Sequence, residues 1–301
     1  MRNKIQNHHF YELDVIRFIA ALSVVLFHLA FRGWNMEDIG YDPYPELSYF
    51  FKYGYLGVDI FFMVSGFVIL LTASRKGPIS FIKSRISRLY PAYWTCATAT
   101  FFFAIFFPIA NYILGFIDYL VNLTMLQGFL GFHHIDGSYW TLMIELQFYA
   151  MILIILTLRL IHHIHILLGL WLISLLCIDL YNCSEVLKSI LIYKWGHYFI
   201  SGAVFYLIWK NGIKTYLLAL LLVCYIRALR LGYWYMNLKE NLSGIAYDKW
   251  TIITLISLFF IIFFLIAIKK FKIHSKKIAF LGNLTYPLYV SAISYKGNAG
   301  I

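Results

Sequence analysis

The sequence predicts an all-α bundle of membrane-spanning helices. Of the 301 residues, 61% are hydrophobic and 13% are charged, whereas a soluble domain carries about 25% charged residues. Apolar runs of about 20 residues, the length that crosses a ~30 Å hydrocarbon core, recur from one end of the chain to the other. Because no internal repeat or soluble segment interrupts this pattern, we expect a single membrane-embedded domain over residues 1–301.

About nine segments have the length and apolar composition of a membrane span. The first of them contains Arg17 and has no small-residue cleavage site after it, which argues against a removable signal peptide. Long polar connections are expected at 32–54, 109–138 and 232–249. The expected spans, in chain order, are 13–31, 55–73, 90–108, 139–158, 164–181, 189–208, 214–231, 250–268 and 277–295.

Lys and Arg are concentrated in alternate connections, which predicts the orientation of the bundle. They precede the first span, fill the connection between the second and third spans, and recur before the ninth. Because cytosolic connections carry the excess of Lys and Arg, we predict a cytosolic amino terminus. The basic connections contain Arg2, Lys4, Arg75, Lys76, Lys83, Arg85, Arg88, Arg159, Lys210, Lys214, Lys269, Lys270, Lys272, Lys276 and Lys277.

The formal net charge of +11 does not indicate a nucleic-acid partner. The basic residues lie in short connections, where orientation during insertion accounts for them. The four cysteines have neither metal-ligand nor paired spacing, so we expect them to be packing residues. His133, His134 and Asp136 have a loose metal-like spacing, but adjacent histidines in a loop are commonly solvated, and we predict no metal site.

Arg17 and His28 lie on one predicted span, where ionisable groups are costly. Insertion scales assign roughly 2.5–3.5 kcal/mol to a charged residue at the centre of a membrane helix, so a functional role is its default interpretation. At 100° per residue their separation comes to three turns plus about 20°, which places both side chains on one helix face. The rise between them is about 16 Å. One face therefore carries a cation toward one membrane surface and an imidazole toward the other.

The predicted topology sorts the other embedded charges into two layers. Two arginines come just before the third span, on the cytosolic side. Two carboxylates come one to two turns into the second and fourth spans from the outer side, at the level of the histidine. The cytosolic layer thus holds Arg17, Arg85 and Arg88, and the outer layer holds His28, Asp59 and Glu145.

This division suits the transfer of a group across the membrane. Arginines bind phosphate through permanently charged, fork-shaped donors. An imidazole with a carboxylate behind it can remove a proton from a hydroxyl, since its pKa lies near neutral pH. A phosphate-bearing donor on the inside and a hydroxyl acceptor on the outside would therefore fit acyl transfer.

Structural roles compete with that interpretation. A histidine near a helix end is commonly interfacial or hydrogen-bonded, and topology alone accounts for Arg85 and Arg88. A capping or pairing role is the alternative for Asp59. The glycines around it favour close helix packing over a phosphate loop.

Four segments between residues 13 and 149 place these ionisable residues in motifs. They are Leu13-Asp14-Val-Ile-Arg17 with His28, Gly57-Val-Asp59-Ile-Phe-Phe-Met-Val-Ser65-Gly66, Arg85-Ile-Ser-Arg88-Leu-Tyr-Pro91-Ala-Tyr93, and Trp140-Thr-Leu-Met-Ile-Glu145-Leu-Gln-Phe148-Tyr149. In this order they resemble the acyltransferase-3 family of membrane proteins, with Thr141 where Ser is common. An Arg and a His separated by ten residues are the hallmark of that family.

The resemblance implies an enzyme of about ten helices in the bacterial inner membrane. Such enzymes move acyl groups, commonly acetyl, from cytosolic acyl-CoA to hydroxyls of cell-surface glycans, lipid-linked sugars or related acceptors. The resemblance implies catalytic roles for His28, Asp59 and Glu145, with His28 as the base, and acyl-CoA-binding or structural roles for Arg17, Arg85 and Arg88. Direct transfer is the expected route, with an acyl-histidine intermediate as the alternative.

The carboxyl end departs from the family pattern. Leu281-Gly-Asn-Leu-Thr-Tyr286-Pro-Leu-Tyr289 resembles a family motif that relatives follow with a His and a final helix, whereas 290–301 lack the His. The odd number of spans also leaves Ile301 on the outer side. We therefore expect a truncated or frameshifted chain. An inactive remnant is one alternative function, and a transporter or flippase of a glycan or lipid precursor, with the embedded charges along its path, is another.

Overall fold

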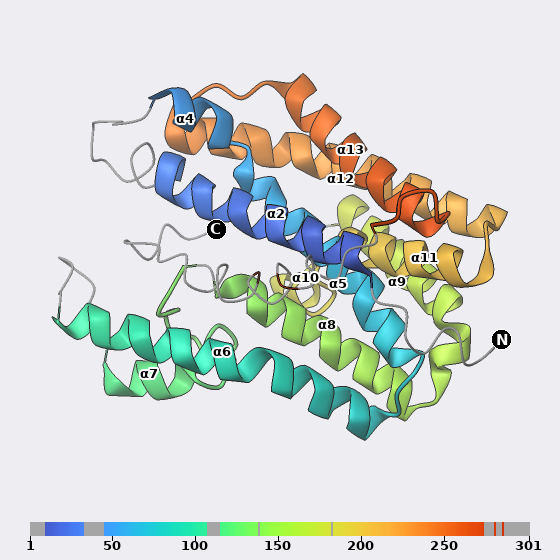
Figure 1. Cartoon of the computed structure of the whole chain (residues 1–301), viewed down its shortest axis with the longest axis horizontal. Helices are drawn as coiled ribbons and strands as arrows, with labels where there is room; N and C mark the ends of the chain where they lie inside the picture. Colours follow the sequence, from blue (N-terminus) through green and yellow to red (C-terminus); the bar gives the residue numbers. More distant parts are fainter. Residues whose placement is uncertain are drawn as a thin grey trace.

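The computed structural model describes residues 10–32, 45–106, 115–137, 139–181, 183–273, 280 and 285. Within these residues the chain folds into helices and contains no β-strand (Figure 1). In hydrocarbon a helix satisfies its backbone N–H and C=O groups internally, which is why long apolar runs adopt it. The predicted all-α bundle is confirmed.

The helices divide into long ones that form the bundle and short ones that connect them. The long helices are α2 (Tyr11–Phe27), α5 (Gly57–Ala73), α6 (Pro78–Phe106), α8 (Trp140–Thr157), α9 (Ile164–Leu180), α11 (Gly196–Asn211), α12 (Thr215–Ser243) and α13 (Lys249–Ala267). The short elements are α4 (Pro45–Phe51), α7 (Phe116–Asn122), α10 (Glu185–Ile190), the π turn η1 (His28–Arg32), and the 3-10 turns η2 (Gly54–Leu56) and η3 (Leu160–His163).

Seven helical stretches of the described residues are long and apolar enough to cross a membrane. They coincide with every predicted span except 189–208 and 277–295. The second of these exceptions, together with the unusual ending after Tyr289, lies outside the described residues apart from two isolated positions. The protein is therefore a multi-pass membrane protein, as predicted.

The prediction of one continuous span over 189–208 is wrong. The structure has the short helix α10, a turn at Ile192 with a φ of 52°, and then α11. At 1.5 Å per residue the 16 residues of α11 rise only about 24 Å. All residues from Gly196 to Trp209 are buried, so α11 is enclosed by other helices rather than by lipid.

Two predicted helix boundaries are also wrong. Helix α6 begins at Pro78, so Arg85 and Arg88 lie inside a helix and not in the connection before it. Helix α12 continues to Ser243, so most of the predicted connection 232–249 is helical. Polar residues suggested an end to both spans, but Tyr235 and Lys239 line a pocket inside the bundle, where polarity does not require the helix to stop.

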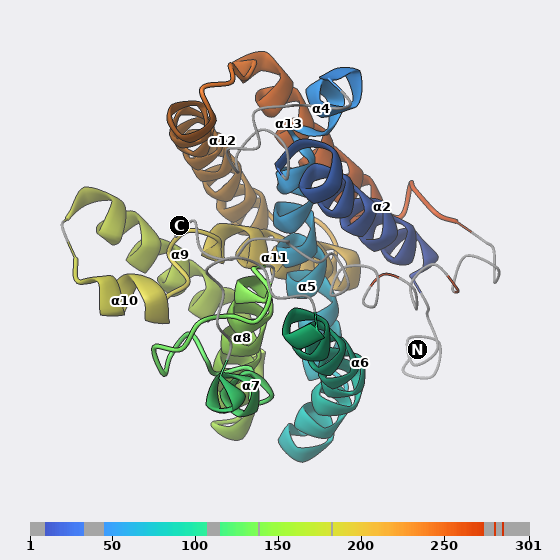
Figure 2. The same ribbon diagram turned by 90° about the vertical axis from the view of Figure 1, so that its left-hand side faces the viewer.

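Helix α5 lies at the centre of the bundle. Figure 2, which looks along the helices, shows it among its neighbours, and α2, α6, α8 and α11 all pack against it. Its glycines allow very close approaches. A Cβ at Gly57 would lie 2.6 Å from the Ala20 carbonyl oxygen of α2, and Cβ atoms at Gly66 and Gly202 would collide with the facing backbones of α11 and α5. The expectation that the glycines around Asp59 serve helix packing is confirmed at Gly57 and Gly66.

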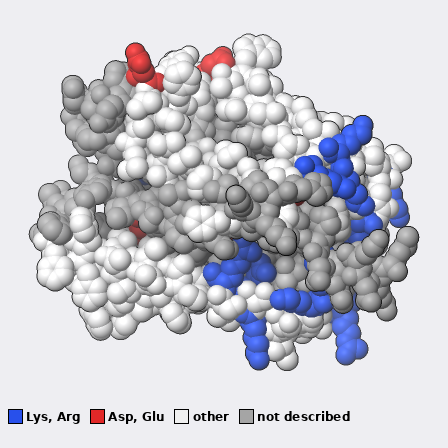
Figure 3. All heavy atoms as spheres, viewed as in Figure 1, with Lys and Arg blue, Asp and Glu red and all other residues white. Residues whose placement is uncertain are grey.

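Charged side chains are unevenly distributed over the surface. Most Lys and Arg on the face shown in Figure 3 lie in its right-hand half, toward the ends at which α2 and α6 begin, whereas prominent acidic side chains lie at the upper left. This is the asymmetry on which the predicted orientation depends. A cytosolic amino terminus stays a prediction.

The glycine contact between α5 and α11 predicts a strong response to a single methyl group. Gly202→Ala would force the Met63 backbone away, and overpacking of this kind costs about 1–3 kcal/mol. We expect a lower midpoint of thermal unfolding for the detergent-purified variant. Gly169→Ala is the matched control, since the nearest atom to its new Cβ is 3.9 Å away. Equal thermal stability of the two variants would contradict the close packing.

Candidate active site

The ionisable residues predicted from the sequence line two neighbouring pockets. His28 and Asp59 line the first, the histidine pocket, which has about 820 Å³ of empty space. Arg17, Arg85 and Glu145 line the second, the arginine pocket, of about 650 Å³, together with Arg88. Helices α2 and α5 contribute to both pockets, so the two sites share part of their framework.

Close packing of α2 on α5 places His28 and Asp59 in the wall of the same pocket. His28 stands where α2 gives way to the π turn η1, and Asp59 is in the first turn of α5. Gly57 lets the two backbones approach beside them. A π turn redirects side chains at a helix end and is frequent at functional sites. The apolar periodicity of the sequence does not distinguish a π turn from a continuing α-helix, so this turn could not be predicted.

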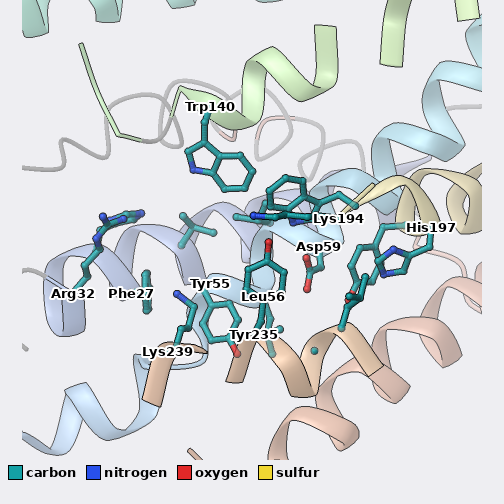
Figure 4. Close-up of a pocket in the computed structure, with 17 residues that line it drawn as sticks. Phe27, Arg32, Tyr55, Leu56, Asp59, Trp140, Lys194, His197, Tyr235 and Lys239 are labelled. Carbon is teal, nitrogen blue, oxygen red and sulfur yellow. The ribbon is translucent and has the colours of Figure 1, made fainter. Parts of the chain in front are cut away.

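The Asp59 carboxylate lies in the middle of the histidine pocket (Figure 4). Tyr198 of α11 hydrogen-bonds it through its side chain. Lys239 approaches from α12, where its ammonium lies 4.5 Å from the centre of the Tyr55 ring. Asp59 is therefore held by neighbours from two other helices, and a carboxylate so placed can stabilise a nearby imidazolium.

Glu145 does not join His28 as the predicted layers required. Its Oε1 accepts hydrogen bonds from Ser65 Oγ at 2.7 Å and from the Tyr149 hydroxyl at 2.6 Å. It lines the arginine pocket instead. The prediction used its depth along α8 alone, but the helix rotation turns this side chain toward α5 and α6. The outer layer is thus one imidazole and one carboxylate.

The two arginines of α6 occupy different environments. Arg85 is only 7% exposed, and its Nη2 donates to Thr72 Oγ1 at 3.4 Å and to Ser84 Oγ at 3.3 Å. Its Nε is buried without a partner among the described residues. Arg88, one turn later, is exposed and still lines the pocket. Arg85 therefore suits a structural or deep binding role, and Arg88 can reach a ligand that enters from solvent.

Three aromatic side chains separate the two pockets. The ring centres of Trp140 and Trp195 lie 4.6 Å apart, and Phe62 lies 6.4 Å and 5.9 Å from them. Trp140 and Trp195 line the histidine pocket, whereas Phe62 and the residue after Trp140 line the arginine pocket. We call these three residues the aromatic wall. No residue lines both pockets, so the aromatic wall stands between the two sites.

Several charged and polar residues of the histidine pocket were not predicted. Tyr235 and Lys239 were assigned to a connection, and Arg32 and Lys194 received no role. His197 lies within the predicted span 189–208, so its position among apolar residues was an available signal. Asp179 and Arg227 are likewise charged residues within predicted spans. They form a buried ion pair, with Arg227 Nε 3.0 Å from Asp179 Oδ2, and Arg227 contacts His197. The charged and polar lining residues that were not predicted include Arg32, Tyr55, Lys194, His197, Tyr198, Tyr235 and Lys239.

The loop histidines form no metal site with other described residues. His134 Nδ1 lies 2.9 Å from Gln127 Nε2, and Asn122 donates to the His133 carbonyl oxygen at 2.9 Å. Burial lowers the pKa of His134. These contacts tie the loop between α7 and α8 together, which accounts for the polar cluster.

Comparison with known proteins decides the family. Residues 10–293 match the family that is described as an acyltransferase domain, the acyltransferase-3 family. The chain belongs to the acyltransferase-3 family. It is therefore a membrane-embedded transferase of acyl groups.

Relatives of this acyltransferase come from a virus and from rhizobia. ORF330 of Acidianus two-tailed virus, named as an acetyltransferase, is 26% identical over 91% of this chain and 80% of its own length. Nodulation protein 10 of Rhizobium leguminosarum bv. viciae is 27% identical over 49% of this chain and 44% of its own. The exopolysaccharide production protein ExoZ of Rhizobium meliloti (strain 1021) is 37% identical over 16% of each chain. No solved structure matches the chain.

The hydrogen bonds to Glu145 predict a measurable loss of stability. Tyr149→Phe removes a donor to a carboxylate, and hydrogen bonds to charged groups contribute about 1.5–3 kcal/mol. We expect a lower unfolding midpoint in detergent than for Tyr119→Phe, whose hydroxyl is hydrogen-bonded to the neutral Thr98 hydroxyl at 2.9 Å. A neutral pair contributes about 0.5–1.5 kcal/mol. Equal losses in the two variants would contradict the stronger hydrogen bond from Tyr149 to Glu145.

Proposed function

We propose that this acyltransferase moves an acyl group, acetyl in the simplest case, from cytosolic acyl-CoA to a hydroxyl of a cell-envelope glycan or lipid-linked sugar. The protein would lie in the bacterial inner membrane with its amino terminus in the cytosol. The single observation that supports this reaction is the pair of pockets with different chemistry on the two sides of the aromatic wall. One suits a phosphate-bearing donor and the other suits proton removal from a hydroxyl.

The arginine pocket is the proposed donor site. Acyl-CoA carries phosphates, and arginine binds phosphate through paired, permanently charged donors. Arg88 is exposed at this pocket and Arg17 lies deeper, so the phosphates would meet Arg88 first. The pantetheine arm would then extend toward the aromatic wall, over a distance similar to the ~16 Å rise between Arg17 and His28 along α2.

The histidine pocket is the proposed acceptor site. His28 takes the proton of the acceptor hydroxyl as the oxygen attacks the thioester carbonyl, and Asp59 stabilises the resulting imidazolium. The carbon–sulfur bond breaks, the ester bond forms, and the proton on His28 passes to the departing CoA sulfur. Glu145 lines the arginine pocket, so we assign the proton transfer to His28, with Asp59 as the carboxylate that stabilises the imidazolium.

The names of two relatives favour a glycan acceptor. ExoZ is named for exopolysaccharide production and the other rhizobial protein for nodulation, whereas the viral relative is named as an acetyltransferase. The aromatic residues of the histidine pocket also suit a sugar, since binding sites combine apolar surface with a few well-placed polar groups. Acetyl transfer to a sugar hydroxyl is consistent with the names of the relatives and with the aromatic lining of the pocket.

Removal of the proposed base predicts loss of transfer without loss of the fold. His28→Ala should lower the transfer of label from radiolabelled acetyl-CoA to cell-envelope glycans by about 10²- to 10⁴-fold, the usual contribution of general acid–base catalysis. The assay uses detergent-purified protein, with thermal unfolding to confirm that the variant folds. His162→Ala, which changes an exposed histidine of η3, is the control.

The same assay separates the enzyme from its rival. Undiminished transfer by His28→Ala would contradict the assignment of the base. Movement of a glycan or lipid precursor across vesicles without acyl-CoA, together with no label transfer by the wild-type protein, would instead support a transporter.

The exposure difference between the two α6 arginines predicts different kinetic effects. Arg88→Gln should raise the KM for acetyl-CoA by about 3- to 10-fold with little change in kcat, because a partly solvated charge contact contributes up to about 1 kcal/mol or slightly more. Arg85→Gln should also lower thermal stability, since Arg85 is buried and hydrogen-bonded. Lys83→Gln, an exposed change on the same helix, is the control. An unchanged KM in Arg88→Gln would contradict a phosphate contact there.

A further inference from the structure

Hydrogen-bond donors outnumber acceptors in the wall of the histidine pocket. Lys194, Lys239 and Arg32 contribute only donors, and among the residues that line the pocket Asp59 is the single carboxylate. Tyr198 already hydrogen-bonds Asp59. The pocket is therefore positively charged and has few groups that can accept a hydrogen bond from a ligand.

The three cations form no direct ion pair within the described part of the chain, although Asp59 is an electrostatic neighbour of Lys239 and Glu185 of Lys194. Instead, the Lys194 ammonium lies 5.8 Å from the centre of the Trp195 ring, and the Lys239 ammonium lies 5.2 Å from that of Phe27. Cation–π contacts hold the ammonium groups at the wall and leave their charge available to a ligand.

His197 adds a donor whose direction is set by its surroundings. Its Nδ1 lies 2.9 Å from Arg227 Nη1, and a guanidinium can only donate, so Nδ1 accepts and Nε2 carries the hydrogen. Asp179 fixes Arg227 through contacts of 3.0 Å and 3.2 Å. The His197 side chain is 0% exposed, it lines the pocket, and its Nε2 has no partner among the described residues.

Two tyrosine hydroxyls in the same pocket, those of Tyr55 and Tyr235, are also buried without a hydrogen-bond partner among the described residues. Buried polar groups are rarely left unpaired, because each one loses its hydration without compensation. Three unpaired polar atoms around one cavity therefore point to a ligand that accepts several hydrogen bonds.

We infer that the acceptor held in the histidine pocket carries an anionic group, a carboxylate or a phosphate, close to the hydroxyl that is acylated. This inference rests on the proposed function and specifies its acceptor. The anionic oxygens would meet Lys194, Lys239 and His197 Nε2–H, while the sugar rings would pack on Trp140 and Trp195. A neutral sugar would leave half-buried cations and buried donors unpaired, whereas an anion pairs with them and makes the pocket selective.

Two sources can supply such an anion, and binding measurements separate them. The first probe is a glucuronic-acid-containing oligosaccharide compared with its carboxyl-reduced, neutral counterpart. The second is a polyprenyl phosphate sugar compared with the matching neutral polyprenol glycoside. Binding to the detergent-purified full chain is measured by calorimetry without acyl-CoA, so that it does not depend on catalysis.

We expect the charged member of one pair to bind about 10- to 100-fold more tightly than its neutral counterpart, as charge-assisted hydrogen bonds allow. In the double variant Lys194→Gln, Lys239→Gln this preference should fall to about twofold or less. Lys188→Gln, which changes a lysine outside the pocket that pairs with Glu185, should keep it. Equal binding within both pairs, or an unchanged preference in the double variant, would overturn the inference.

His197 is tested by a conservative and a non-conservative change. His197→Gln keeps an amide N–H near the position of Nε2 and should retain most of the preference, whereas His197→Leu should lose it. The lysine variants decide the inference if His197→Leu does not fold. Tight binding of the charged probe without acyl transfer would support an anionic ligand and contradict the proposed function. Acyl transfer to neutral sugars, with no preference for charged ones, would support the proposed function and contradict the anionic acceptor.

Discussion

The close packing of α5 against α2 and α11 is the constraint on which the rest of the structure depends. Gly57 allows α2 to approach, and Gly66 and Gly202 allow α11 to approach from the other side. In a membrane, helix association depends on packing and hydrogen bonds rather than on the hydrophobic effect, so small residues at the contact are decisive. Because α5 carries Asp59, this packing also places the carboxylate in the pocket that His28 lines.

The two pockets differ in chemistry although their walls are in contact through Phe62, Trp140 and Trp195. On α5, Asp59 lines the histidine pocket, and Phe62, less than one turn later, lines the arginine pocket. At the start of α8, Trp140 lines the histidine pocket and Thr141 lines the arginine pocket. A donor and an acceptor can thus be bound by separate sets of charges and still meet across the aromatic wall. The proposed reaction needs this combination of separation and proximity.

Much of the fold could be predicted because a bilayer restricts the possible elements. Length and apolarity located seven spans, and Arg17 and His28 both lie in the first of them, as predicted. The errors fell where polar residues lie inside the bundle. Tyr235 and Lys239 were assigned to a connection because polarity near a span resembles a membrane surface, but a pocket wall accommodates them equally well.

The sequence by itself determined the helical membrane architecture, the family motifs and the identity of the ionisable residues. Only the tertiary structure decided which of these residues share a pocket. Glu145 shows the difference, since its depth along α8 predicted a place beside His28, whereas the rotation of the helix directs it to Ser65. The Asp179–Arg227–His197 contacts likewise join three helices. Depth follows from position along one helix, but pairing depends on the rotation and spacing of several, which only their packing sets.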